Sequence, residues 1–183
     1  MDGVRLLDGV FKQVAEVNKE LVHIWISNIV FSWRWCLALV LTFLPWVVWA
    51  KIRDKKNTVR LLFVGLAVVI ITDSLDIIGL SYDLWHYDWT LTPFIPEFIP
   101  WDYTLFPVAV MTMLQFKPKV NVFIKAITFA FISAFIMEPL FNWMGMYNLV
   151  HWEYIYSFSI YIPLFFIFNY IYKCRLFEKK DNF

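Results

Sequence analysis

The sequence has little of several features that most folded proteins of its length contain, and each shortage excludes a class of protein. Only 17% of its 183 residues are charged, two are cysteine, and the formal net charge is +1. Two cysteines cannot form a disulfide framework, and a near-neutral chain offers no basic footprint for nucleic acid. Glycine-rich phosphate loops, Cys-x-x-Cys pairs, His-Glu-x-x-His zinc motifs and Gly-x-Ser-x-Gly nucleophile elbows do not occur. We therefore expect no nucleic-acid partner, and no short motif assigns a reaction.

Apolar and aromatic residues are present in excess. The chain is 61% hydrophobic and 21% aromatic, and its mean hydropathy is +0.61. A soluble domain is typically about 45–50% apolar and about 25% charged. One small core cannot bury this surplus, so part of it must face the lipid bilayer. Because helices satisfy their own backbone hydrogen bonds in lipid, we expect an all-α, polytopic membrane helical bundle.

Five segments are long and apolar enough to be predicted as transmembrane helices. A span needs about 20 mostly apolar residues to cross a hydrocarbon core of about 30 Å. The predicted spans are 33–52, 60–82, 101–116, 120–141 and 151–172. The third is the shortest and contains Pro107. We divide the chain into an N-terminal segment (1–30), one five-span domain (31–175) and a C-terminal cytoplasmic tail (176–183).

The N-terminal segment is predicted to be an amphipathic helix. Apolar residues recur at helical spacing from Leu7 to Trp25, with charged residues between them. This pattern is typical of a helix that lies in the membrane interface. A soluble cap that packs on a partner protein fits the pattern nearly as well.

Basic residues are distributed unevenly along the chain and predict its orientation. Five of them lie in 51–60, three in 117–125 and four in 173–180, whereas 81–100 and 141–150 contain none. Short loops rich in Lys and Arg remain in the cytoplasm, so we expect the N-terminus outside and the C-terminus inside a cell membrane. Cys36 and Cys174 then lie at opposite ends of different spans, and we expect two free thiols.

Acidic residues within and near the spans are the candidates for chemistry. Asp73 and Asp76 lie in the second predicted span, and their i, i+3 spacing places them on one helical face. Carboxylates at such depth are costly and normally face a bundle interior or a water-filled cavity. A structural pair of hydrogen-bonded acids is the alternative interpretation. The candidate ligand- or ion-binding residues are Asp73, Asp76, Asp102, Glu138, His151 and Glu153.

These acids have no Lys or Arg neighbour in the outer loops. Clustered carboxylates without counter-charges reduce their repulsion by binding a cation or by holding protons. The sequence names no cofactor, although Asp, Glu and His together suit a divalent cation. Asp83, Asp88 and Glu97 are expected to be solvated loop charges instead.

A weak internal repeat links two of the candidate acids. Asp73 and Glu138 are each followed nine residues later by a tyrosine and then by a Trp-x-Tyr motif. A duplicated two-helix unit would bring the two acidic faces together about an axis along the membrane normal. Chance would also produce such a match in a chain this rich in aromatic residues. The aromatic side chains predicted to line the cavity are Tyr82, Trp85, Tyr87, Tyr147, Trp152 and Tyr154.

A constellation of motifs covers most of the chain: Trp33-x-Trp35, Pro45-Trp46, Asp73, Asp76, Pro100-x-x-Tyr103, Glu138 and Trp152-x-Tyr154. It resembles a family of small, uncharacterised multi-pass membrane proteins of endospore-forming bacteria. This resemblance implies about five spans and supplies no activity.

A second set consists of Asp76, Gly79, Trp85-x-Tyr87 and Pro100-Trp101-Asp102. It has a more distant likeness to the small membrane lycopene cyclase domain. That domain carries two adjacent glutamates where this sequence has Asp102-Tyr103, so one of the two acids is missing here. Protonating a polyene needs a poised acid, so the likeness implies the fold rather than the cyclase reaction.

Three functions agree with these observations. The first is a transporter or sensor subunit that binds a cation or a proton-coupled ligand in an acidic, aromatic-lined cavity in the outer half of the bilayer. The second is an enzyme acting on an isoprenoid or another lipid, with Asp76 or Asp102 as the general acid. The third is a non-catalytic assembly subunit whose acids pair with the basic residues of a partner subunit in the membrane.

Overall fold

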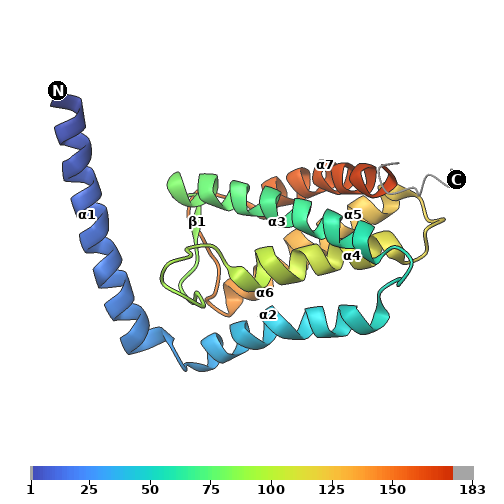
Figure 1. Cartoon of the computed structure of the whole chain (residues 1–183), viewed down its shortest axis with the longest axis horizontal. Helices are drawn as coiled ribbons and strands as arrows, with labels where there is room; N and C mark the ends of the chain where they lie inside the picture. The colour runs from blue at the N-terminus through green and yellow to red at the C-terminus, as the bar shows by residue number, and fades with distance from the viewer. Residues whose placement is uncertain (1, 175–183) are drawn as a thin grey trace, which may run out of the picture.

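The computed structural model describes residues 2–174, which form six continuous helices, with one long loop (82–100) between the third and the fourth (Figure 1). The first consists of α1 (Asp2–Ile24) and the π-helical turn η1 (Trp25–Ile29). The others are α2 (Trp33–Ile52), α3 (Thr58–Ser81), η2 (Trp101–Leu105) with α4 (Phe106–Gln115), α5 (Val122–Ile132) with η3 (Ser133–Met137) and α6 (Glu138–Trp143), and α7 (Tyr154–Lys173). Two short antiparallel strands, β1 (Trp85–His86) and β2 (Asn148–Leu149), join two loops at one end. The all-α prediction is therefore confirmed.

Four of these helices are long and apolar enough to cross a membrane. They are Trp33–Ile52, Thr58–Ser81, Val122–Trp143 and Tyr154–Lys173, and they coincide with the first, second, fourth and fifth predicted spans. The segments predict a multi-pass membrane protein, and the helices of the structure agree with that prediction.

The third predicted span is shorter than the others. Its five π-helical and ten α-helical residues extend about 22 Å at about 1.5 Å per residue, which is less than the hydrocarbon core. A proline limits it at the C-terminal end, because a proline disfavours helical backbone at the residue before it. That proline is Pro118, which follows Lys117, whose φ is 43°. Pro100, at the other end, has helical φ and ψ and lies in the first turn, where its missing N–H is tolerated.

The helices pack around an apolar core. α3 packs on α4 and α7, α5 packs on α7, and α2 packs on η2 and α4. Val64 and Val68 of α3, Phe106 of α4 and Phe165 of α7 are at most 1% exposed in this core. α2 lies along one side of the bundle (Figure 1), and its apolar side chains away from α4, such as Phe43 at 63% exposed, face outward as lipid-facing residues do.

One end of the bundle carries the basic connections and is closed by polar contacts. The backbone N–H of Asp54 donates to Oε1 of Gln115 at 2.9 Å, and Nδ2 of Asn57 donates to Oδ2 of Asp54 at 2.7 Å. The hydrogen bond from Asn57 lowers the pKa of Asp54. Nζ of Lys125 donates to the carbonyls of Met113 and Phe116 at 2.6 and 2.7 Å, which satisfies the C-terminus of α4.

Tryptophan side chains hold the loops at the opposite end, the predicted outer end. Nε1 of Trp25 donates to the carbonyl of Thr90 at 2.9 Å, and Nε1 of Trp35 donates to that of Leu91 at 3.2 Å. Nε of Arg34 donates to the carbonyl of Met144 at 2.7 Å. These bonds join α2 and η1 to both outer loops, so the indoles act as loop anchors as well as interfacial residues.

The two cysteines are free thiols, as the sequence predicts. Cys36 is exposed near the start of α2, and Cys174 is half-buried after α7.

α1 extends away from the outer end of the bundle and runs across the direction of the bundle helices (Figure 1). Its apolar residues are exposed: Leu7 is 56%, Phe11 69% and Val14 48% accessible. The predicted helix is therefore present, and its apolar face is free of the bundle.

Candidate functional site

One cavity, near the end of the bundle that is predicted to be the outer end, gathers acidic and aromatic side chains. Its volume is about 180 Å³. Three carboxylic acids line it: Asp76 from α3, Asp102 from η2 and Glu138 from α6. The aromatic side chains that form its walls are Trp85, Tyr87, Phe98, Trp101, Phe106, Phe141, Tyr147, Trp152 and Tyr161. We call it the acidic cavity.

Asp76 is 6% exposed and is held by two aromatic donors. Nε1 of Trp85 donates to its Oδ1 at 3.1 Å, and the hydroxyl of Tyr87 donates to the same oxygen at 3.2 Å. Its Oδ2 has no hydrogen-bond partner among the described residues. Trp85 reaches back to Asp76 across Gly79, where a Cβ atom would overlap the indole ring.

Asp102 is 2% exposed and lies in the π-helical turn that begins the third predicted span. Its carboxyl group lies next to that of Asp76. Its Oδ2, like that of Asp76, has no partner in the part of the chain that the structure describes. Two adjacent carboxyl groups repel unless a proton or a cation lies between them.

Glu138 is 5% exposed and begins α6 directly after the π-helical turn η3. The hydroxyl of Tyr161 donates to its Oε1 at 2.6 Å. Its Oε2 has no partner within residues 2–174. Ser157 lies beside it and accepts a hydrogen bond from Nε1 of Trp152 at 2.9 Å. Glu138, from the fourth predicted span, therefore lines the same cavity as Asp76 from the second.

The acidic cavity contains no basic side chain. An ion pair joins His86 and Asp88 at 3.5 Å, and it lies on the surface outside the cavity lining. A buried charge without a partner is costly, so the cavity requires protons or a positively charged ligand. Within residues 2–174, no group of three or more His, Cys, Asp or Glu side chains is arranged to hold a metal ion. The geometry thus gives no support to the divalent cation that the composition of the cluster suits.

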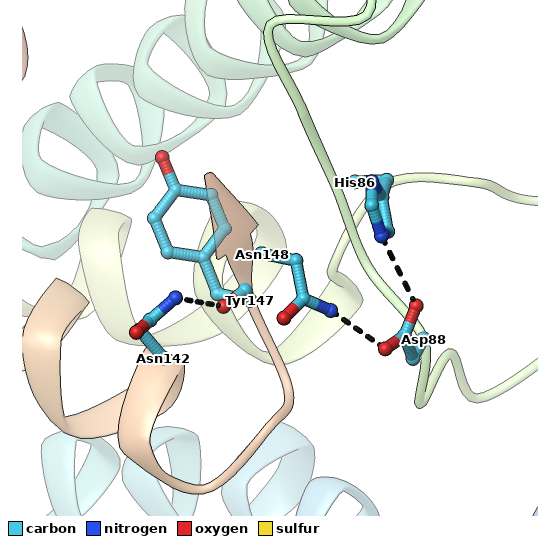
Figure 2. Close-up of polar contacts among 5 residues, drawn as sticks. All are labelled: His86, Asp88, Asn142, Tyr147 and Asn148. Atoms are coloured by element: carbon cyan, nitrogen blue, oxygen red, sulfur yellow. Dashed lines mark hydrogen bonds and ion pairs between the residues drawn. The ribbon is translucent and has the colours of Figure 1, made fainter. Parts of the chain in front are cut away.

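The two outer loops supply Trp85, Tyr87 and Tyr147 to the cavity lining, and Figure 2 shows polar contacts in and between these loops. Trp85 pairs with Leu149 and His86 with Asn148 in the β1–β2 ladder. Nδ2 of Asn148 donates to Oδ2 of Asp88 at 2.6 Å, next to the His86 contact. The α3 side of the cavity is therefore joined to the α6 side. Because His86 and Asp88 are half exposed, their ion pair contributes little to stability.

Two tyrosines from these loops, Tyr87 and Tyr147, line the cavity. The rings of Tyr87 and Tyr147 stack with their centroids 5.5 Å apart, and Nδ2 of Asn142 donates to the carbonyl of Tyr147 at 2.8 Å (Figure 2). Burial raises the pKa of both tyrosines, and the neighbouring carboxyl groups raise it further. Both hydroxyls therefore stay protonated and can donate hydrogen bonds into the cavity.

The structure separates the predicted site residues into two groups. Those that line the acidic cavity are Asp76, Asp102, Glu138, Trp85, Tyr87, Tyr147 and Trp152. Those that do not line it are Asp73, His151, Glu153, Tyr82 and Tyr154. Asp73 is half-buried and accepts a hydrogen bond from the hydroxyl of Tyr103 at 2.8 Å.

The remaining members of the second group lie toward the solvent-exposed edge of the molecule. Tyr82 is 74% exposed, His151 and Glu153 are exposed, and Tyr154 is half-buried at the start of α7.

Several lining residues have no sequence signal that would select them. Phe98, Trp101, Phe141 and Tyr161 form much of the wall, yet each is one aromatic residue among many in this chain. Glu97 is also a correction: it is 6% exposed and not a solvated loop charge. Glu97 precedes Phe98 in the loop that contains Pro93, Pro96 and Pro100. The ring of Phe98 is 1% exposed and stacks on that of Tyr87 with centroids 5.6 Å apart, which holds this part of the loop against the cavity wall.

No family model, no curated protein and no solved structure matches this chain.

Proposed function

We propose that this multi-pass membrane protein binds a small organic cation in the acidic cavity, as a transporter or sensor subunit. One observation carries the proposal: three buried carboxyl groups, each with an oxygen that lacks a hydrogen-bond partner among the described residues, line a single cavity without a base. Aromatic faces attract cations through their quadrupoles, and this attraction is strongest where water is excluded. The walls of the cavity therefore favour the same charge as its acids.

The size of the cavity limits the ligand. At about 180 Å³ it is comparable with an apolar cavity of about 150 Å³ that binds benzene. A quaternary ammonium or protonated amine group of similar size fits this space, and a larger ligand would place only its head group here. A small organic cation also needs no coordination shell, in agreement with the absence of a metal-holding group among residues 2–174.

The distribution of charge supports a location and an orientation. We place the protein in a bacterial cell membrane with the N-terminus outside and the C-terminus in the cytoplasm. The basic connections lie at one end of the bundle, and the acidic cavity lies near the other. Short loops rich in Lys and Arg stay in the cytoplasm, so this rule supports a cytoplasmic location for the basic end. The cavity then faces the outer half of the bilayer.

A pair of ligands that differ in charge alone tests the proposal. The protein is reconstituted in nanodiscs of phosphatidylglycerol, which carries no cationic head group, and titrated calorimetrically with choline and with its neutral isostere dimethylbutanol. We expect choline to bind and dimethylbutanol to bind at least about tenfold more weakly, a difference of about 1.4 kcal/mol. Equal binding of the two ligands, or no binding of choline, would contradict the proposal.

Matched substitutions identify the site. Asp76→Asn and Glu138→Gln keep the acceptor oxygens for Trp85, Tyr87 and Tyr161 and remove the charge, so we expect each to weaken choline binding about tenfold or more. Asp83→Asn is the control, because Asp83 is exposed in the outer loop with φ at 52°, a conformation that asparagine adopts readily. Loss of choline binding in the control to the same extent would indicate a surface effect.

A second candidate, an enzyme acting on an isoprenoid or another lipid, is favoured by the adjacency of Asp76 and Asp102. In this reaction the protonated carboxyl group of one aspartate delivers its proton to a double bond, and the aromatic rings stabilise the resulting carbocation. Loss of a proton elsewhere in the molecule would then give an isomer of unchanged mass. Chromatography of a polyene incubated with the reconstituted protein tests this reaction. A new isomer that Asp102→Asn abolishes would support the enzyme, and an unchanged polyene would contradict it.

A further inference from the structure

A second, larger cavity lies beside the acidic one. Its volume is about 400 Å³, and it lies among α2, α4, α5 and η3. Its lining is apolar apart from Thr112 and Ser133. Two residues, Trp101 and Phe106, line both cavities and form the wall between them.

The residues that line this apolar cavity lie along the bundle helices and not in the loops at its end. Pro45, in the middle of α2, and Ile132, which is 43% exposed, both belong to the lining. Both lie well within helices that are long enough to span the membrane. At that depth the surrounding medium is hydrocarbon, so we infer that lipid chains reach the cavity beside Ile132.

We propose that the two cavities hold two parts of one ligand, an amphiphile with a cationic head group and a hydrocarbon chain. The head group occupies the acidic cavity and the chain occupies the apolar cavity, and the ligand enters from the bilayer between α2 and α5. This inference rests on the proposed function and names the class of its ligand.

The contrast between the two linings carries the inference. The acidic cavity has unpaired carboxyl oxygens and room for a head group. The apolar cavity has no charged residue in its lining, and its volume lies within the range of about 300–1,000 Å³ that small-molecule sites occupy. A freely soluble cation would have no use for an apolar space that opens to lipid.

Two packed aromatic rings form the wall that a chain joining the cavities would cross. The rings of Trp101 and Phe106 meet edge to face with centroids 5.7 Å apart. Trp101 is half-buried, and Nε1 of Trp46 donates to the carbonyl of its neighbour Tyr103 at 3.1 Å, which ties this turn to α2. The first methylene groups of the chain would pass along the indole face, next to the carboxyl of Asp102.

The experiment compares one protein change against two ligands. Ala109 lines the apolar cavity and does not line the acidic one, so Ala109→Phe fills the chain space alone. Ala50→Phe is the matched control, because Ala50 is exposed on α2 and adds the same volume toward lipid. Both variants and the unchanged protein are titrated with choline and with dodecyltrimethylammonium in the same phosphatidylglycerol nanodiscs. Partition of the longer ligand into the bilayer is then identical in every titration.

We expect Ala109→Phe to weaken dodecyltrimethylammonium binding at least about tenfold and to leave choline binding within about twofold. Ala50→Phe should change neither. If Ala109→Phe binds both ligands as the unchanged protein does, the chain lies elsewhere and the inference is overturned, while the proposed function stands. If the unchanged protein binds neither ligand, the proposed function itself fails.

A smaller substitution protects the test against misfolding. If Ala109→Phe loses choline as well, Ala109→Val gives the same comparison with a smaller change in volume. A loss of about threefold or more for dodecyltrimethylammonium alone would then support the inference, and equal affinities would overturn it.

Discussion

The indole of Trp85 reaches the carboxyl of Asp76 because residue 79 has no side chain. Gly79 follows Asp76 by three residues on α3, and the chain returns through β1 to lay Trp85 on this face. A glycine within a helix usually costs about 1 kcal/mol relative to alanine. At position 79, however, glycine allows Trp85 to donate a hydrogen bond to the buried Asp76 and to form one wall of the acidic cavity.

We predict that Gly79→Ala destabilises the protein by about 1–3 kcal/mol, because the new Cβ displaces the Trp85 ring from a packed position. It should also weaken choline binding, since Asp76 loses a donor. The control is Gly9→Ala in α1, where nothing lies within 4 Å of the added Cβ and helix propensity rises. Thermal unfolding and near-ultraviolet circular dichroism in nanodiscs measure both. Equal melting temperatures for Gly79→Ala and the unchanged protein would show that Trp85 is not held by this contact.

At the scale of the helix, the π-helical turns place two of the acids. Asp102 lies in η2, and Glu138 directly follows η3. A proline lies just after each turn, at Pro107 and Pro139. A proline cannot donate to the carbonyl four residues earlier and clashes with it in an α-helix, so a wider turn relieves the contact. The carbonyl that Pro107 leaves free, that of Tyr103, accepts the hydrogen bond from Nε1 of Trp46.

These turns also explain which parts of the molecule could be predicted from sequence. Hydropathy and charge identify the helices and the two unlike ends, because both depend on composition averaged over about 20 residues. A π turn adds one residue and shifts the helical face by about 100°. Asp73 and Asp76 lie in the regular helix α3, and neighbouring residues of η2 separate their roles: Asp73 accepts a hydrogen bond from Tyr103, whereas Asp76 lines the cavity with Asp102. Aromatic lining residues such as Phe98 and Tyr161 depend on the fold of the loops and have no pattern of their own.

α1 allows a prediction at the same scale. Its exposed apolar face and its direction across the bundle helices (Figure 1) are those of a helix that lies in a membrane–water interface, here the one predicted on the outer side of the cell membrane. Nitroxide labels are placed along α1 in a variant with both cysteines replaced by serine, and their accessibility to oxygen and to a nickel chelate is measured in nanodiscs. We expect Val14→Cys to be oxygen-accessible as lipid-facing sites are, and Glu16→Cys to be accessible to the nickel chelate. Uniform exposure of both sites to the nickel chelate would instead indicate a water-exposed helix, free to cap a partner.

At the scale of the whole molecule, two helical pairs meet around the cavity. α3 packs with α4, and α5 packs with α7. Each second helix begins at a Trp-acid-Tyr sequence, Trp101-Asp102-Tyr103 in one pair and Trp152-Glu153-Tyr154 in the other. The antiparallel β1–β2 ladder joins the two pairs at the outer end. This correspondence differs from the predicted one, which aligned 85–87 with 152–154, and it places the acidic cavity where the two pairs face each other.

The basic connections and the acidic cavity lie near opposite ends of the bundle, so the orientation of the protein decides from which side a ligand reaches the cavity. Two single-cysteine variants are made in the serine-substituted background: Phe94→Cys, at a site 79% exposed in the outer loop, and Lys55→Cys, at an exposed site in the basic connection. We expect a membrane-impermeant maleimide to label Phe94→Cys in intact bacterial cells and Lys55→Cys only after permeabilisation. The reverse pattern would turn the molecule over and open the acidic cavity toward the cytoplasm. With the expected pattern, a cationic amphiphile reaches the carboxyl groups of the acidic cavity from the outer leaflet of the bilayer.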